Sequence, residues 1–131
     1  MTRTSIRLPL ALIGASALLV FGASAYAGDS MKEAATAAQH AGLAAKGANI
    51  NQVHMHLHHA VNCLVGPKGE GFDPNNANPC AAAGDGAIPD ATDDAMKTKL
   101  EGALKTAMMG LHTDDMAAAQ KAAMETQEAL K

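Results

Sequence analysis

Aromatic residues are almost missing from this chain of 131 residues, which has two phenylalanines, one tyrosine and no tryptophan. Phe21 and Tyr26 lie near the N-terminus, so Phe72 is the single aromatic residue after position 27. Aromatic side chains bury large apolar areas, whereas the alanines that dominate this sequence bury little. The sequence therefore predicts a thin core, which disfavours a pocket for a non-covalently bound haem.

Long hydrophobic runs are also missing after residue 27, where no segment approaches the roughly 20 apolar residues that a membrane-spanning helix needs. The one extended apolar run, residues 8–21, follows Arg3 and Arg7 and leads into Ala25-Tyr26-Ala27. A basic start, a short apolar run and an A-x-A site are typical of a secretory signal. We expect residues 1–27 to be a signal peptide and residues 28–131 to be exported, to the periplasm or outside the cell, with no membrane span.

Basic residues are few, and the formal net charge of the chain is −3. Removing residues 1–27 takes away two arginines and no acidic residue, which leaves 104 residues with a formal charge of −5. This charge argues against a nucleic-acid partner. The length suits one domain with one modest core, and a homodimer would bury additional apolar area.

Cysteine occurs at two positions, Cys63 and Cys80. No Cys-x-x-Cys-His motif is present, so covalent attachment of a c-type haem is excluded. Thiols in exported proteins are normally oxidised, which predicts a Cys63–Cys80 disulfide. Alternatively, Cys63 follows His59 by four residues and would be able to bind a metal as thiolate.

The rest of the sequence predicts an all-α fold. Ser30 and Glu33 have the spacing of a capping box, Asn49 or Asn51 suits a second N-cap, and Gly66-Pro67 and Gly110 are typical helix ends. We expect helices at about 30–46, 50–65, 93–109 and 114–128, joined by a long loop at 66–92 that the disulfide staples. Two helical hairpins joined in this way indicate a small four-helix bundle in a single domain.

Histidine is concentrated in the second predicted helix, where His54-Met55-His56-Leu57-His58-His59 places four imidazoles within six residues. On a helix, His54 and His58 lie one turn apart, as do His56 and His59, so each pair is able to chelate an ion. Histidine is a mediocre helix former, and four within six residues bring no packing advantage. We therefore predict a metal site formed by His54, His56, His58 and His59, with copper first by the Irving–Williams order and zinc or nickel as alternatives.

Three further residues are auxiliary candidates for this site. Met55 lies inside the cluster, and His40 lies as far before a helical turn near Ala48 as His56 lies after it. His112 precedes the last predicted helix and would return to the end of the bundle where the second helix begins. These observations predict an exported metal-binding protein that sequesters or delivers the ion.

Two other classes of function compete with this prediction. An envelope structural or interaction module would present the histidine face to a protein partner and need no metal. A metal-dependent enzyme would want a general base near its ligands, yet no Glu lies in the histidine run and no Ser–His–Asp or Cys–His arrangement is evident. The acidic positions of the 66–92 loop do not match a calcium-binding EF-hand.

Overall fold

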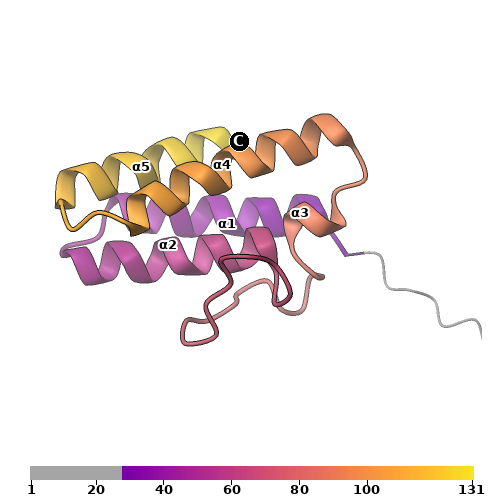
Figure 1. Cartoon of the computed structure of the whole chain (residues 1–131), viewed down its shortest axis with the longest axis horizontal. Helices are drawn as coiled ribbons and strands as arrows, with labels where there is room; N and C mark the ends of the chain where they lie inside the picture. Colours follow the sequence, from indigo (N-terminus) through magenta and orange to yellow (C-terminus); the bar gives the residue numbers. More distant parts are fainter. Residues whose placement is uncertain (1–27) are drawn as a thin grey trace, which may run out of the picture.

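The computed structural model describes residues 28–131, and this part of the chain is helical, with no strand. Four long helices are joined by loops and one short helical turn (Figure 1). They are α1 (Ser30–Ala45), α2 (Ile50–Val65), α3 (Ala87–Asp90), α4 (Asp94–Leu111) and α5 (Met116–Ala129). No helix in this range is long and apolar enough to cross a membrane. The predicted signal peptide lies outside the described residues.

The four long helices form two hairpins, α1–α2 and α4–α5, which pack against each other (Figure 1). Within the resulting bundle α4 lies beside α2, and α5 lies beside α1. The chain therefore runs up and down the bundle, and each long helix is antiparallel to its two neighbours. The predicted all-α bundle of two helical hairpins joined by a disulfide-stapled loop is confirmed.

Each long helix begins at an acidic or amide N-cap. Asp29, Asn49, Asp93 and Asp115 use a side-chain oxygen to accept a hydrogen bond from the backbone amide three residues later. Such caps satisfy amides that have no partner within the helix. The capping box predicted at Ser30 and Glu33 does not form, because both side chains bond instead to the segment around α3.

Small side chains dominate the core. Its largest fully buried apolar side chains are Leu57, Leu64, Leu100, Val53 and Val61, and alanines fill most of the remaining positions. On α5 the buried residues are Ala119, Ala122, Ala123 and Thr126. Small side chains let helix backbones approach closely, which is how a sequence with so few large residues forms an interior.

The sequence predicted that α4 ends at Gly110, but the helix continues to Leu111. The role of Gly110 is packing. A Cβ at this position would lie 2.7 Å from Leu57 Cδ1 on α2 and 3.1 Å from Ala122 Cβ on α5. The glycine therefore permits the close contact of α4 with both neighbours, and the chain turns at His112 instead.

The segment between α2 and α4 is fixed at several points. Gly66 ends α2 as predicted, in a left-handed backbone conformation with φ 68°, and a Cβ there would lie 1.5 Å from the Asp85 carbonyl oxygen. Cys63 and Cys80 form the predicted disulfide, which excludes Cys63 as a thiolate ligand. The single turn of α3 was not predicted, because four residues carry too little periodicity to distinguish a helix from a loop.

Removing the disulfide by replacing Cys63 and Cys80 with alanine should lower the free energy of unfolding by about 3 kcal/mol. The bridge joins residues 17 apart, and the main effect of its loss is greater chain entropy in the unfolded state. Urea unfolding of the variant measures this effect, and reduced wild-type protein is the control that should reproduce it. A loss below about 1 kcal/mol would contradict the assigned role.

Candidate metal centre

Three histidines from two helices converge on one side of the α1–α2 hairpin. His56 and His59 lie one turn apart on α2, and His40 lies opposite them on α1. One ring nitrogen from each residue lies within 4.8 Å of those from the other two. The ring centroids are 5.6 Å apart for His40 and His56, 5.0 Å for His40 and His59, and 5.6 Å for His56 and His59. We call His40, His56 and His59 the histidine triad.

Helix packing places His40 in this group. Ala37, Ala41 and Ala44 form the buried face of α1, and His40 lies at the edge of that face. On α2, Leu57, Ala60 and Val61 are buried, and His56 and His59 lie beside them. The Nδ1 atoms of His40 and His56 are 3.4 Å apart, so one can donate to the other when a single proton lies between them.

The electrostatics favour neutral imidazole at His40 and His59. Burial lowers the pKa of His40 below its ordinary value, and the nearby His59 and His56 lower it further. Burial also lowers the pKa of His59, with added contributions from His56 and His58. Bringing three cations together at partly buried positions is unfavourable, whereas neutral rings present lone pairs to a metal ion.

One nitrogen of the triad lacks a partner. His59 Nδ1 is buried and forms no hydrogen bond to residues 28–131. Buried polar atoms are normally paired, so the unpaired Nδ1 of His59, like that of His58 outside the triad, is a nitrogen that could bind a ligand. This observation is independent of the short distances between the rings.

The other predicted ligands lie elsewhere. His54 Nε2 is 3.0 Å from the Thr113 carbonyl oxygen, so the turn after α4 does return to the start of α2. His58 Nδ1 lies 3.5 Å from Asp73 Oδ2 without forming a directed hydrogen bond to it, and burial lowers the pKa of His58. His112 Nδ1 bonds to the Met108 carbonyl oxygen at 2.6 Å. The structure brings His56 and His59 together with His40, but it groups neither His54, His58 nor His112 with them.

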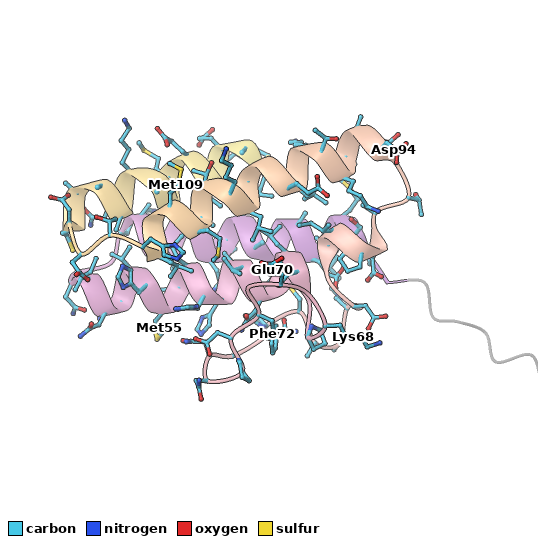
Figure 2. The ribbon with its side chains drawn as sticks, in the orientation of Figure 1. Met55, Lys68, Glu70, Phe72, Asp94 and Met109 are labelled. Atoms are coloured by element: carbon cyan, nitrogen blue, oxygen red, sulfur yellow. A yellow bond between two sulfur atoms is a disulfide. The ribbon has the colours of Figure 1, made fainter. Side chains whose placement is uncertain are left out.

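Sulfur ligands are not part of the triad. Met55 is 39% exposed, and its side chain points outward from α2 (Figure 2). Both cysteines are in the disulfide and offer no thiolate. The donor set that these residues can present is therefore three imidazole nitrogens, which suits borderline ions better than soft Cu(I) or hard Ca²⁺.

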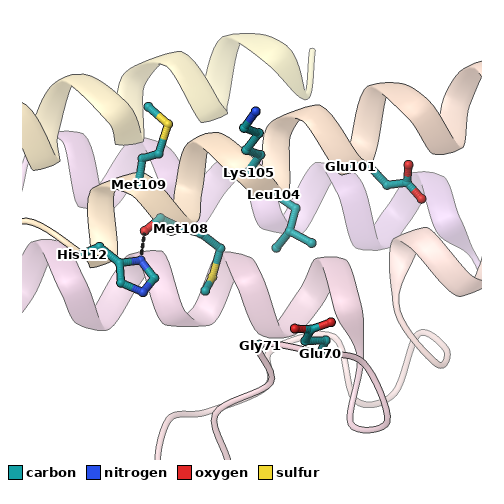
Figure 3. A pocket seen from close by; sticks show the side chains of 8 residues that line it. All are labelled: Glu70, Gly71, Glu101, Leu104, Lys105, Met108, Met109 and His112. Atoms are coloured by element: carbon teal, nitrogen blue, oxygen red, sulfur yellow. Dashed lines mark hydrogen bonds between the residues drawn. The ribbon is translucent and has the colours of Figure 1, made fainter.

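A separate shallow groove lies between α4 and the loop that follows α2 (Figure 3). Its lining is mostly apolar, from Leu104, Met108 and Met109, with Glu70, Glu101 and Lys105 at its edges. None of the triad histidines lines it. His112 is the single histidine in the groove, and its ring lies beside the Met108 side chain in Figure 3.

The triad can therefore hold a metal ion by three nitrogens and leave further coordination positions open. All three residues were named from the sequence, with His40 as an auxiliary candidate, and the equal spacing of His40 and His56 from the α1–α2 turn was the signal for it. Comparison of the chain with protein-family models, curated proteins and solved structures found no match.

Proposed function

We propose that this protein binds a divalent transition-metal ion through the histidine triad, and that it is an exported protein that sequesters the ion or hands it on. The observation that carries the proposal is the convergence of three ring nitrogens within 4.8 Å of one another. Binding one ion would require these nitrogens to move closer together, because His ligands bind zinc at about 2.0–2.1 Å.

Copper is the first candidate for the ion. An all-imidazole donor set accepts copper, nickel and zinc, and affinities in such sites follow the Irving–Williams order, in which Cu(II) binds most tightly. The absence of a thiolate from the triad removes the main reason for a site to prefer Cu(I). We therefore propose that the triad binds Cu(II), and that zinc and nickel bind to the same residues more weakly.

The exposure of the site supports a role in exchange. His40, His56 and His59 are all partly exposed, so an ion bound there is reachable from solvent and by an accepting molecule. Three protein ligands also leave positions that water or an incoming ligand can occupy. A closed structural site, in contrast, surrounds its ion with four protein ligands.

Titration of the oxidised protein, residues 28–131, with Cu(II), Zn(II) and Ni(II) at about pH 7.5 tests the proposal. The key variant replaces His40, His56 and His59 with alanine, and its matched control replaces His54, His58 and His112, which removes the same number of imidazoles. We expect the first variant to lose at least about a hundredfold in Cu(II) affinity and the control to lose much less.

Circular dichroism of both variants checks that the bundle is intact. Equal losses in the two variants would show that binding depends on histidine number rather than on the triad, and this would contradict the proposal. Binding that is weak and unchanged in both variants would also contradict it. That second result would favour the interaction module with no metal.

A further inference from the structure

A buried acidic side chain lies at the opposite end of α1 from its turn into α2. Glu33 is in the first turn of α1, and its relative exposure is 0%. Its Oε1 accepts a hydrogen bond from the Gly86 backbone amide at 2.9 Å, while its Oε2 is buried and forms no hydrogen bond to any described residue. No salt bridge involving Glu33 forms within residues 28–131. An ionised carboxylate in this position would be strongly disfavoured.

A second carboxyl group approaches the same point from α3. A Cβ at Gly84 would lie 2.1 Å from Asp90 Oδ2 and 3.0 Å from Glu33 Oε1, so both carboxyl groups lie against this glycine. Asp90 Oδ2 also accepts a hydrogen bond from the Asp85 amide at 2.8 Å. The Asp90 charge disfavours ionisation of Glu33, because two carboxylates that share a site cannot both ionise without a large cost.

These two carboxyl groups lie where the start of α1 contacts the segment around α3. The Asp29 amide donates to the Ala83 carbonyl oxygen at 3.0 Å, and the Ser30 hydroxyl donates to the Ala87 carbonyl oxygen at 2.7 Å. With the Gly86 amide bond to Glu33, they connect α1 to residues 83–87. The contact is therefore built from hydrogen bonds around a buried acid, with few large apolar side chains.

We propose that Glu33 and Asp90 share one proton and form a pH-sensitive clamp, which holds the 83–90 segment on the start of α1 and weakens as the pH rises towards neutrality. The shared proton removes a buried negative charge and gives Glu33 a hydrogen to donate. The charged groups that act on the Glu33 carboxyl are Asp90 on α3 and Asp29 at the start of α1, and both are acidic.

The protonation energetics agree with this geometry. Burial, opposed in part by the Gly86 hydrogen bond and reinforced by Asp90 and Asp29, raises the pKa of Glu33 from 4.5 to about 7. Because the folded protein holds the proton to a higher pH than the unfolded chain does, stability is greatest at low pH. It decreases as the pH rises from the unfolded value to the folded one. Above about pH 7 this loss is complete.

Replacing Glu33 by glutamine tests the clamp, because glutamine is neutral at every pH and keeps both an acceptor for Gly86 and a donor. Urea unfolding of wild type, Glu33→Gln and the exposed control Glu101→Gln would be measured between about pH 5 and 9 with a chelator present. We expect the ratio of folding constants, Glu33→Gln over wild type, to rise by up to about tenfold per pH unit between pH 5 and 7. The corresponding ratio for Glu101→Gln over wild type should not change with pH. Histidine titration affects wild type and both variants equally, so it cancels in these ratios.

Asp90→Asn supplies a second test that does not depend on the folding of the first variant. It removes one negative charge, so the loss of stability that wild type shows between about pH 5 and 7 should shrink in this variant, and protection of the Gly86 amide from hydrogen exchange should vary less with pH. A pH-independent deficit in Glu33→Gln, or an unchanged wild-type profile in Asp90→Asn, would overturn the proposal. Stabilisation of wild type by Ca²⁺ at about pH 8 would overturn it as well, because the pair would then be a cation site.

Discussion

Metal affinity is expected to fall by orders of magnitude when the pH is lowered from about 7.5 to 5, because protons and the metal compete for the same nitrogens. Burial and neighbouring imidazoles lower the pKa of His40 and of His59 below the ordinary value of 6.5. These rings therefore stay neutral down to a lower pH than an exposed histidine does. Affinity should change little above about pH 6.5 and then decline by up to about tenfold per pH unit for each ring that must lose a proton.

Competition against a chelator whose own pH dependence is known would measure this profile for Cu(II) and Zn(II). The variant with His54, His58 and His112 replaced by alanine is the control, and its profile should keep the wild-type steepness. If the metal affinity declined with falling pH no more steeply than expected for the release of one proton per bound ion, this would contradict binding by three imidazoles. Circular dichroism at each pH separates loss of the ion from unfolding of the bundle.

Replacing Asn62 by alanine should lower the free energy of unfolding by about 3 to 4 kcal/mol, because the side chain connects α2 to the loop that follows it. Asn62 is on α2 with a relative exposure of 0%. Its Nδ2 donates to the carbonyl oxygens of Asp73, Asn76 and Ala77, and its Oδ1 accepts from the Asp73 amide. Alanine would leave these partly buried backbone groups without their partner, and each group that water does not reach costs about 1–3 kcal/mol.

Urea unfolding of Asn62→Ala and Asn62→Asp would measure the effect, with the exposed α2 residue Asn51 changed to alanine as the matched control. The aspartate variant keeps the acceptor and loses the donor, so it should also be destabilised. Because Asp73 contacts His58, loosening the loop should also alter the His58 ring resonances in nuclear magnetic resonance spectra. Equal and small losses in Asn62→Ala and Asn51→Ala would show that the loop is not held by this residue.

Much of the fold follows from short-range rules that the sequence displays directly. Gly66 followed by Pro67 ended α2, and Asn49 began it, because both depend on backbone conformations and caps that are local in sequence. Cys63 and Cys80 paired because they are the only two cysteines of the chain. Alternation of helices and turns then sufficed to predict two antiparallel hairpins.

Features that depend on contacts between distant residues were not predictable in the same way. The sequence marks Gly110 as a helix end, yet its contact with Leu57 and Ala122 requires the finished bundle. Likewise, Ser30 and Glu33 had the spacing of a capping box, but their partners Ala87 and Gly86 lie more than 50 residues away.

The candidate site, too, was only partly predictable from the sequence. The histidine cluster and the height of His40 along α1 were readable from sequence. The sequence did not predict which histidines lie together. Because α1 has alanine on both its buried and its exposed faces, its hydrophobic pattern does not determine which face of the helix packs against α2. The apolar stripe of α2 was clearer. The sequence still did not distinguish its two chelating histidine pairs, because the choice depends on the positions of Thr113, Asp73 and His40.

The alanine-lined contact of α5 has a consequence for the order in which the bundle comes apart. The loop and α2 are joined by a covalent bridge, and α1 is bonded to the α3 segment. Within residues 28–131, the fully buried side chains of α5 are small, Met116 and Leu130 at its two ends add apolar contact, and Gln120 bonds to the Gly47 carbonyl oxygen. Burial of small side chains contributes little free energy per residue. On gentle heating, α5 should therefore detach as a cooperative unit before the α1–α2 hairpin opens, so the histidine triad outlasts the four-helix state.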